Sequence, residues 1–198
     1  MNINFEVEKG NAHLIVFVHG LQGSKKTFYE GKDKNYFHEH FESIILNHVD
    51  IAYLEYHTED ILGKNSITYL LSKVFRFAKR ESVENLNIEE LSISATYKIE
   101  KILENYESVS FICHSMGGLI AKGVLIKSKT ILEKTKFYIT LATPHRGTNK
   151  AKFLNGINRQ VKSLEENSQI IRYLSENYTS IENKPSRHYY RATDESWV

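Results

Sequence analysis

The sequence predicts an α/β fold, with a mostly parallel sheet and helices on both faces, and three observations support this prediction. The run Leu14–Val18 is unbroken and apolar and stops at His19 and Gly20, as is typical of a strand buried on both faces of a parallel sheet. Similar strand-like runs follow at 49–54, 109–113 and 137–141. Segments with helical periodicity lie between these runs, and such alternation indicates parallel strands joined by crossover helices.

The remaining elements follow from local patterns along the chain. Apolar residues recur at helical spacing from Tyr36 to Ile45, which predicts a helix between the first two strands. Further helices are expected over Ile88–Tyr106 and from about Met116 to Lys127, and His188–Ala192 predicts a last strand. No repeat or linker interrupts this order, so we expect a single domain over residues 1–198.

The segment between the second predicted strand, which ends at Leu54, and Val109 is longer than one crossover helix requires, so part of it is expected to be an insertion. Within it, six apolar residues fall on one helical face, namely Ile67, Leu70, Leu71, Val74, Phe75 and Ala78. This amphipathic stripe indicates a helix that lies on the sheet or over a cleft. Peripheral contact with a membrane surface is the alternative.

Composition and charge exclude several classes of function. The chain has 198 residues, of which 26 are Lys or Arg and 24 are Asp or Glu, so its formal net charge is +2. The two signs are interspersed, which gives no electrostatic case for nucleic acid. The one cysteine, Cys113, excludes an internal disulfide and a cysteine-based zinc cluster. The N-terminus carries no signal-peptide pattern, so we expect a cytoplasmic protein.

The strongest chemical motif is the run Phe111–Ile120, in which a buried strand turns sharply through Ser115 into a helix. Such a turn exposes the serine at the end of the sheet, and the helix offers the positive end of its dipole to a developing negative charge. The turn needs small residues, which Gly117 and Gly118 supply, and Cys113 stands where the usual motif has a glycine. The pattern predicts Ser115 as a nucleophile. The alternative is a serine that only caps the next helix.

A second motif, His19–Ser24, is a glycine-rich turn at the end of the first strand. Acyl transfer needs backbone N–H groups directed at the oxyanion, and such a turn can present them. The N–H groups of Leu21 and Met116 are the predicted pair. The alternative is that Gly20 and Gly23 only permit a tight turn.

These motifs, together with the loop Leu141–Thr148, resemble those of serine esterases and lipases of the α/β-hydrolase superfamily. In particular they are similar to those of the lipase-like group that includes GPI-inositol deacylases and bacterial triacylglycerol lipases, and the resemblance spans about residues 13 to 148. It implies an α/β-hydrolase-type sheet, Ser115 as nucleophile, and Leu21 and Met116 as oxyanion donors. The residues expected to line the pocket are His19, Gly20, His114 and His145.

In this superfamily the triad residues follow in the order Ser, Asp or Glu, His. Asp194, just after the last predicted strand, fits the acid, with Glu195 as the neighbouring alternative, but no histidine follows it. We therefore expect a hydrolase domain that lacks the C-terminal strand and helix, with the catalytic histidine beyond Val198. His145 or His188 in a non-standard arrangement is a second possibility, and an inactive site is a third.

The function predicted from these residues is hydrolysis of carboxylic esters, of small molecules or lipids, through an acyl-enzyme on the serine. An incomplete hydrolase-fold module that binds or signals within a larger protein is the alternative, and acyl transfer to an acceptor other than water is a third idea. No cofactor or metal is expected, and the oligomeric state is open. The segment 144–180 is a candidate cap over an acyl pocket, through residues such as Phe153, Leu154 and Ile157.

Overall fold

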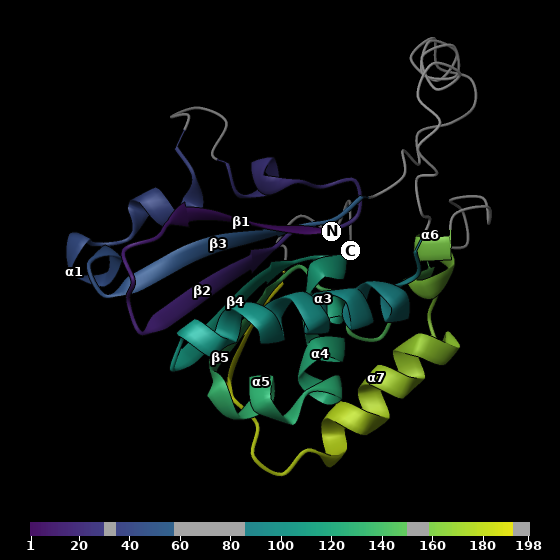
Figure 1. Ribbon diagram of the computed structural model, residues 1–198. Coiled ribbons are helices and arrows are strands. Elements are labelled where there is room, and N and C mark those ends of the chain that lie inside the picture. The colour runs from purple at the N-terminus through teal and green to yellow at the C-terminus, as the bar shows by residue number, and fades with distance from the viewer. Residues whose placement is uncertain (30–34, 58–85, 150–158, 192–198) are drawn as a thin grey trace, which may run out of the picture.

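The computed structural model describes residues 1–29, 35–57, 86–149 and 159–191, and in them the chain forms a six-stranded sheet (Figure 1). The strands are β1 (Asn2–Val7), β2 (His13–Val18), β3 (Val49–Glu55), β4 (Ser108–His114), β5 (Thr135–Leu141) and β6 (Ser186–Tyr190). Their order across the sheet is β1-β3-β2-β4-β5-β6. β1 is antiparallel to β3, and the other neighbouring pairs are parallel. The mostly parallel sheet predicted from the sequence is therefore confirmed.

The longer helices of the described ranges cover one face of this sheet. They are α3 (Ile88–Ile102), α4 (Met116–Lys127), α5 (Lys129–Lys134) and α7 (Gln169–Ser180), with the short η3 (Leu103–Asn105) after α3 and α6 (Arg159–Ser163) before α7. α4 contacts both α3 and α7, and the buried side chains of the three helices form one apolar cluster with β2, β4 and β5 (Figure 1). On the opposite face, the 3-10 helices η1 (Lys25–Phe28) and η2 (Phe37–His40) and the short α1 (Ser43–Leu46) lie near β2 and β3.

Strand β2 lies in the middle of the core. Leu14, Val16 and Val18 are 0% exposed and belong to the cluster beneath the helices, whereas Phe17, also 0% exposed, belongs to the cluster on the opposite face. Side chains of a strand alternate between faces, so a strand covered on both sides has an unbroken apolar sequence. The interpretation of this run as a doubly buried strand is confirmed.

Helix α4, which begins directly after Ser115, is held between its neighbours by close packing. A Cβ placed on Gly123 would lie 2.3 Å from Ser92 Oγ on α3, so only glycine allows this approach of the two helices. α4 also contacts α7, whose buried residues are Ile171, Leu174 and Tyr178. The start of α4 is therefore fixed relative to the end of the sheet.

One predicted element is wrong and one is shifted. Instead of a continuous helix over 36–45, the chain forms η2, an extended residue at Phe41 (φ −69°, ψ 138°) and the single turn of α1. Tyr36 and Phe41 pack against the Phe17 cluster, so their spacing reflects aromatic contacts with the sheet. The last strand runs over Ser186–Tyr190 and begins earlier than expected. The amphipathic stripe at 67–78 lies outside the described residues.

Neither β1 nor α7 is predicted from the sequence. α7 falls inside the segment 144–180 that was expected to form a cap, and it packs in the core against α4. Phe153, Leu154 and Ile157 lie outside the described residues.

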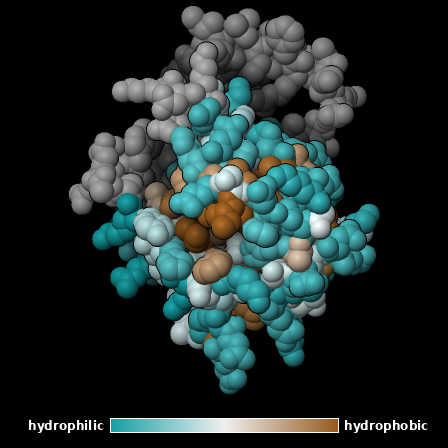
Figure 2. Space-filling model, turned by 90° about the vertical axis from the view of Figure 1, so that its left-hand side faces the viewer, coloured by the Kyte–Doolittle hydropathy of each residue, from teal (hydrophilic) through white to brown (hydrophobic). Residues whose placement is uncertain are grey.

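Figure 2 shows that one side of the molecule is largely hydrophilic, with a small central group of apolar side chains. No helix in the described ranges has the length and apolar character needed to cross a membrane.

Candidate active site

Ser115 occupies the sharp turn between β4 and α4, with φ 51° and ψ −127°. A positive φ is costly for a residue with a side chain, so the surrounding structure must hold this conformation. The Ser115 N–H donates to Leu141 O at 2.8 Å, while its carbonyl accepts from Gly118 N at 3.0 Å and from Thr143 Oγ1 at 2.9 Å. The turn is thus tied both to α4 and to the loop after β5.

Three glycines let the loops at the carboxyl ends of β2, β4 and β5 meet at this serine. A Cβ on Gly20 would lie 2.7 Å from Ser115 Cβ, and one on Gly117 would lie 2.3 Å from Val18 O. A Cβ on Gly118 would lie 2.2 Å from Thr143 Oγ1. Real Cβ atoms do not approach other atoms so closely, so each glycine is required by packing.

The two predicted oxyanion donors lie on either side of this junction. Met116 is the first residue of α4 and Leu21 follows Gly20 in the loop after β2. Neither backbone N–H donates a hydrogen bond to a residue in the described ranges. Free N–H groups beside a serine at a helix N-terminus can stabilise a negative oxygen.

His19 is held as a neutral imidazole. Its Nδ1 lies 2.8 Å from Gly20 O, which can only accept, and its Nε2 accepts from Tyr56 N at 3.3 Å. The ring stacks on Tyr56 at a centroid separation of 4.1 Å, and the Tyr56 hydroxyl donates to His19 O at 2.5 Å. Burial lowers the pKa of His19, although its bond to Gly20 acts in the opposite direction. His19 therefore shapes the loop and is not free to exchange protons.

The neighbouring His114 has a buried Nδ1 without a hydrogen-bond partner among the described residues. This atom would lie 3.2 Å from a Cβ on Gly20, and burial lowers the pKa of the ring. The Ser115 hydroxyl also forms no hydrogen bond with a residue in the described part of the chain. The structure therefore places His114 and Ser115 together at the Gly20 contact, without a bonded pair.

His145 lies in the loop after β5. Its Nε2 is 3.1 Å from Thr140 Oγ1 and its ring lies 4.6 Å from that of Tyr189. Burial, with the positive charges of Lys122 and Arg187, lowers the pKa of His145 to about 4. The imidazolium form is therefore strongly disfavoured.

The remaining candidates for the triad lie apart from Ser115 or outside the described residues. His188 is exposed in β6, and its ring centroid is 6.2 Å from that of Phe137. Its partner across the sheet is Ile139, which packs against the cluster on the face opposite α4. Asp194 lies outside the described residues, as does Glu195. No group of three or more His, Cys, Asp or Glu side chains in the described ranges could hold a metal ion.

Sequence reasoning missed the residues that hold the site together. The sequence marks Thr143 only as part of a loop and gives no signal at Tyr56, yet Thr143 bonds to the backbone of Ser115 and Tyr56 to that of His19. Lys122, whose positive charge lowers the pKa of His145, lies in α4, which has the sequence pattern of an ordinary buried helix. Each contact joins elements far apart in the sequence, so no local pattern marks it.

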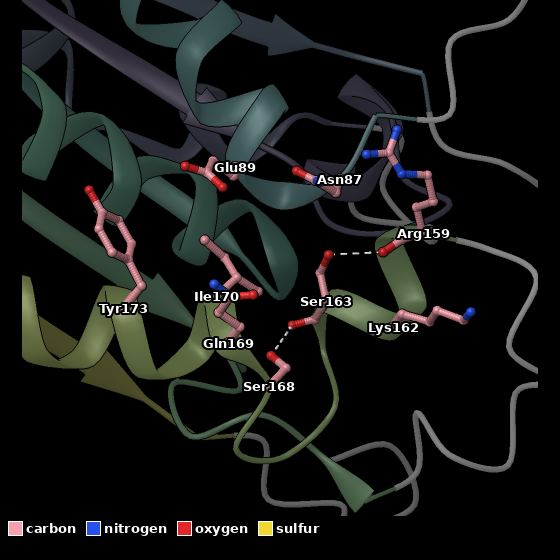
Figure 3. A pocket seen from close by; sticks show the side chains of 9 residues that line it. All are labelled: Asn87, Glu89, Arg159, Lys162, Ser163, Ser168, Gln169, Ile170 and Tyr173. Atoms are coloured by element: carbon pink, nitrogen blue, oxygen red, sulfur yellow. Dashed lines mark hydrogen bonds between the residues drawn. The ribbon is translucent and has the colours of Figure 1, made fainter.

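A cavity of about 410 Å³ lies elsewhere, between the N-terminal parts of α3 and α7 and helix α6 (Figure 3). Most of its lining residues are of polar type, and they include both signs of charge: Asn87, Glu89, Arg159, Lys162, Ser163, Ser168, Gln169, Ile170 and Tyr173. It shares no residue with the predicted active site. We therefore do not assign it to the acyl group.

Comparison with known protein families also indicates a serine esterase. The family described as "Putative serine esterase (DUF676)" matches residues 8–179. No curated protein matches the sequence.

Solved structures share the fold at low sequence identity. The mature lipase BlEst2 of Bacillus licheniformis is 19% identical with a TM-score of 0.60, over 93% of this chain and 66% of the lipase. Phospholipase PlaB of Legionella pneumophila is 16% identical with a TM-score of 0.58, over 89% and 37% of the two chains. Lipase B of Aspergillus fumigatus is 16% identical with a TM-score of 0.55, over 87% and 36%. The chain thus has the α/β-hydrolase fold and spans less than two thirds of the length of these proteins.

Proposed function

Since the chain belongs to the serine esterase family that matches residues 8–179, we propose that it is a serine acyl hydrolase that cleaves carboxylic esters through Ser115. The observation that carries the proposal is the strained serine at the start of α4, beside two backbone N–H groups without acceptors in the described structure. A serine that only capped α4 would bond through its side chain to the first turn, but Ser115 forms no such bond.

The proposed reaction proceeds by acyl transfer to the serine. Ser115 Oγ attacks the ester carbonyl carbon while its proton passes to a base, and the carbonyl oxygen becomes an oxyanion. The N–H groups of Leu21 and Met116 stabilise that oxyanion. The alcohol leaves with a proton, and water then releases the acid from the acyl-enzyme. In this proposal Asp194 orients the histidine that acts as base.

The structure argues against both internal candidates for that base. A base must become an imidazolium, and at His145 burial and two nearby cations oppose this charge. His188 is exposed in β6, and Ile139, the residue that it pairs with in β5, faces away from α4. The variants His145→Gln and His188→Gln test both residues, because the residue that supplies the base is needed for activation of Ser115.

For the substrate we propose an ester with an apolar acyl chain, as in a lipid. Two of the structural relatives are named lipases and one a phospholipase, which supports this class of substrate. The apolar stripe at 67–78 is the proposed element for contact with a lipid surface.

The test is covalent labelling of the full chain with a fluorophosphonate probe, read by intact mass. We expect one probe per chain, no labelling of Ser115→Ala, and normal labelling of Ser180→Ala, an exposed serine at the end of α7. Hydrolysis of p-nitrophenyl esters should fall at least about 10³-fold in Ser115→Ala. Labelling that persists in Ser115→Ala contradicts the proposal, as does its absence from the natural protein with any residues that follow Val198 included.

The absence of a bonded histidine at Ser115 Oγ in the described structure favours one other function, a hydrolase-fold module that binds without catalysis. This alternative predicts a folded chain that binds a fatty acid ester, takes up no probe and leaves the ester intact. The labelling experiment therefore separates the two functions.

A further inference from the structure

Lys122 is a buried cation without a counter-charge in the described structure. The residue is only 5% exposed, and it forms no hydrogen bond or ion pair with a described residue. Its Nζ lies 5.6 Å from the centroid of the Tyr178 ring. An aromatic face offsets only part of the cost of burying an ammonium group, which is ordinarily paired with an anion.

Two further polar atoms around Lys122 are buried without a partner in the described structure, Tyr178 Oη and His145 Nδ1. Tyr178 is 3% exposed, so water does not readily reach its hydroxyl. His145 Nδ1 carries a proton when Nε2 accepts from Thr140 Oγ1 at 3.1 Å. A buried polar group left unpaired costs about 1–3 kcal/mol. Both atoms can donate a hydrogen bond to an oxygen acceptor, as the ammonium can.

Arg187 brings a second cation to the same place from β6. Its Cζ lies 5.8 Å from the ring centroids of both Tyr178 and Tyr189. Burial, with a smaller contribution from Arg187, lowers the pKa of Lys122 to about 8. Like charges held close together without an anion are unfavourable, and this arrangement is therefore incomplete.

The charged group that follows α7 does not supply the missing anion. Lys184, a third cation, has its Nζ 6.0 Å from the Tyr178 ring and donates to the carbonyls of Thr179 and Ile181. No acidic side chain of the described ranges forms an ion pair with Lys122 or Arg187. The group therefore offers donors and positive charge and no negative charge of its own.

We propose that Lys122, Arg187 and Tyr178 form a binding site for an oxyanion, a carboxylate or a phosphate group, where α4 and α7 meet β6. The ammonium, the guanidinium fork and the phenol hydroxyl all donate to oxygen, and the guanidinium fits both kinds of oxyanion. The site shares no residue with Ser115, Leu21 or Met116, so it does not depend on the proposed ester hydrolysis.

The test follows the pKa of Lys122 by NMR in the full chain labelled with ¹³C at lysine Cε, with Lys122→Met to assign the signal. Inorganic phosphate and acetate are the two probes. A bound oxyanion stabilises the ammonium form, so we expect the pKa of Lys122 to rise by about one unit or more as either probe binds. Lys129, whose side chain is 86% exposed, is the control in the same spectra and should not respond.

Variants then test the other two residues. Arg187→Gln, an exposed position in β6, should weaken phosphate binding at least about tenfold. Tyr178→Phe should weaken it about two- to tenfold, because one donor is lost.

Three outcomes decide the proposal. A response to phosphate or acetate that is lost in Arg187→Gln supports a site for a free oxyanion. A pKa of Lys122 that lies at its ordinary value and responds to neither probe indicates a solvated ammonium without a bound oxyanion, and it overturns the proposal. A lowered pKa that neither probe changes at tens of millimolar overturns the proposal.

Discussion

Two buried charges in this molecule have opposite surroundings. Asp50, 0% exposed at the start of β3, accepts hydrogen bonds from backbone N–H groups of Lys9, Gly10 and Asn11 at 3.0, 3.1 and 3.3 Å. The Asn11 side chain and the Tyr106 hydroxyl donate as well, each at 2.9 Å. Lys122, on the other side of the molecule's core, has no such partner in the described structure.

The pKa shifts of the two residues show what this difference means. Burial alone would raise the pKa of Asp50, but the hydrogen bonds from Lys9, Tyr106 and Asn11 outweigh burial and hold the pKa below its usual value. The charged carboxylate is thus the favoured form, and it stabilises the turn between β1 and β2. The pKa of Lys122 is lowered as well, but for lysine this means that the charged form is disfavoured. The chain itself completes the first site and leaves the second open to a ligand.

Removal of the Asp50 carboxylate should have the largest effect. In Asp50→Ala four groups of the β1–β2 turn and the Tyr106 hydroxyl lose their acceptor, so we expect the free energy of unfolding to fall by at least about 3 kcal/mol. Urea denaturation at pH 7 measures this loss. Because the folded pKa of Asp50 is depressed, its contribution is present above the unfolded value near 3.8 and disappears as the pH falls through the folded value.

A control variant sharpens this prediction. Asp50→Asn keeps the shape and one acceptor oxygen, so it should be destabilised less than the alanine variant and should lack the acid-dependent part of the loss. Equal stability of Asp50→Ala and the natural chain would show that the hydrogen bonds of Asp50 contribute nothing to folding.

The second prediction concerns the sign of the Lys122 contribution. Its folded pKa is about 8 against 10.5 for an ordinary lysine, so the unfolded chain binds more protons between these values and stability rises with pH across this range. In buffer without phosphate or carboxylate, Lys122→Met should therefore be more stable than the natural chain near pH 7, by about 1–3 kcal/mol. This advantage should shrink as the pH approaches 10.5.

The comparison variant is Lys129→Met, which alters an exposed lysine. Its unfolding free energy should track that of the natural chain across the same pH range. A Lys122→Met variant that is less stable near pH 7 would indicate that the ammonium already has a partner under these conditions.

The sequence predicts those strands and helices that correspond to a continuous apolar run or to helical periodicity along the chain. The runs that became β2, β3, β4 and β5 are apolar because they are covered on both faces, and α3 and α4 follow from helical periodicity between them. β1 alternates polar and apolar residues, but its pairing with β3 is a contact between distant segments. The spacing from Tyr36 to Ile45 resembles a helix although aromatic packing on Phe17 accounts for it.

The candidate site likewise has features that a local motif predicts and features that depend on contacts between distant segments. The turn at Ser115 and its glycines are visible as motifs, because the strained backbone needs particular residues at fixed spacing. The bonds of Thr143 to Ser115 and of Tyr56 to His19 join separate strands and leave no local signal. The same is true of Lys122 and Arg187, which meet only when α4 packs beside β6.

The smallest predicted effects come from two tyrosines that differ in one bond. The Tyr106 hydroxyl donates to Asp50, whereas the Tyr178 hydroxyl is buried without a partner in the described structure. Tyr106→Phe should lower the free energy of unfolding by about 1.5 kcal/mol, and Tyr178→Phe should change it by less than about 0.5 kcal/mol in buffer without phosphate or carboxylate. Urea denaturation of both variants in parallel measures the difference. A substantial loss in Tyr178→Phe under these conditions would mean that its hydroxyl is already bonded, and the contrast between the two buried charges would no longer hold.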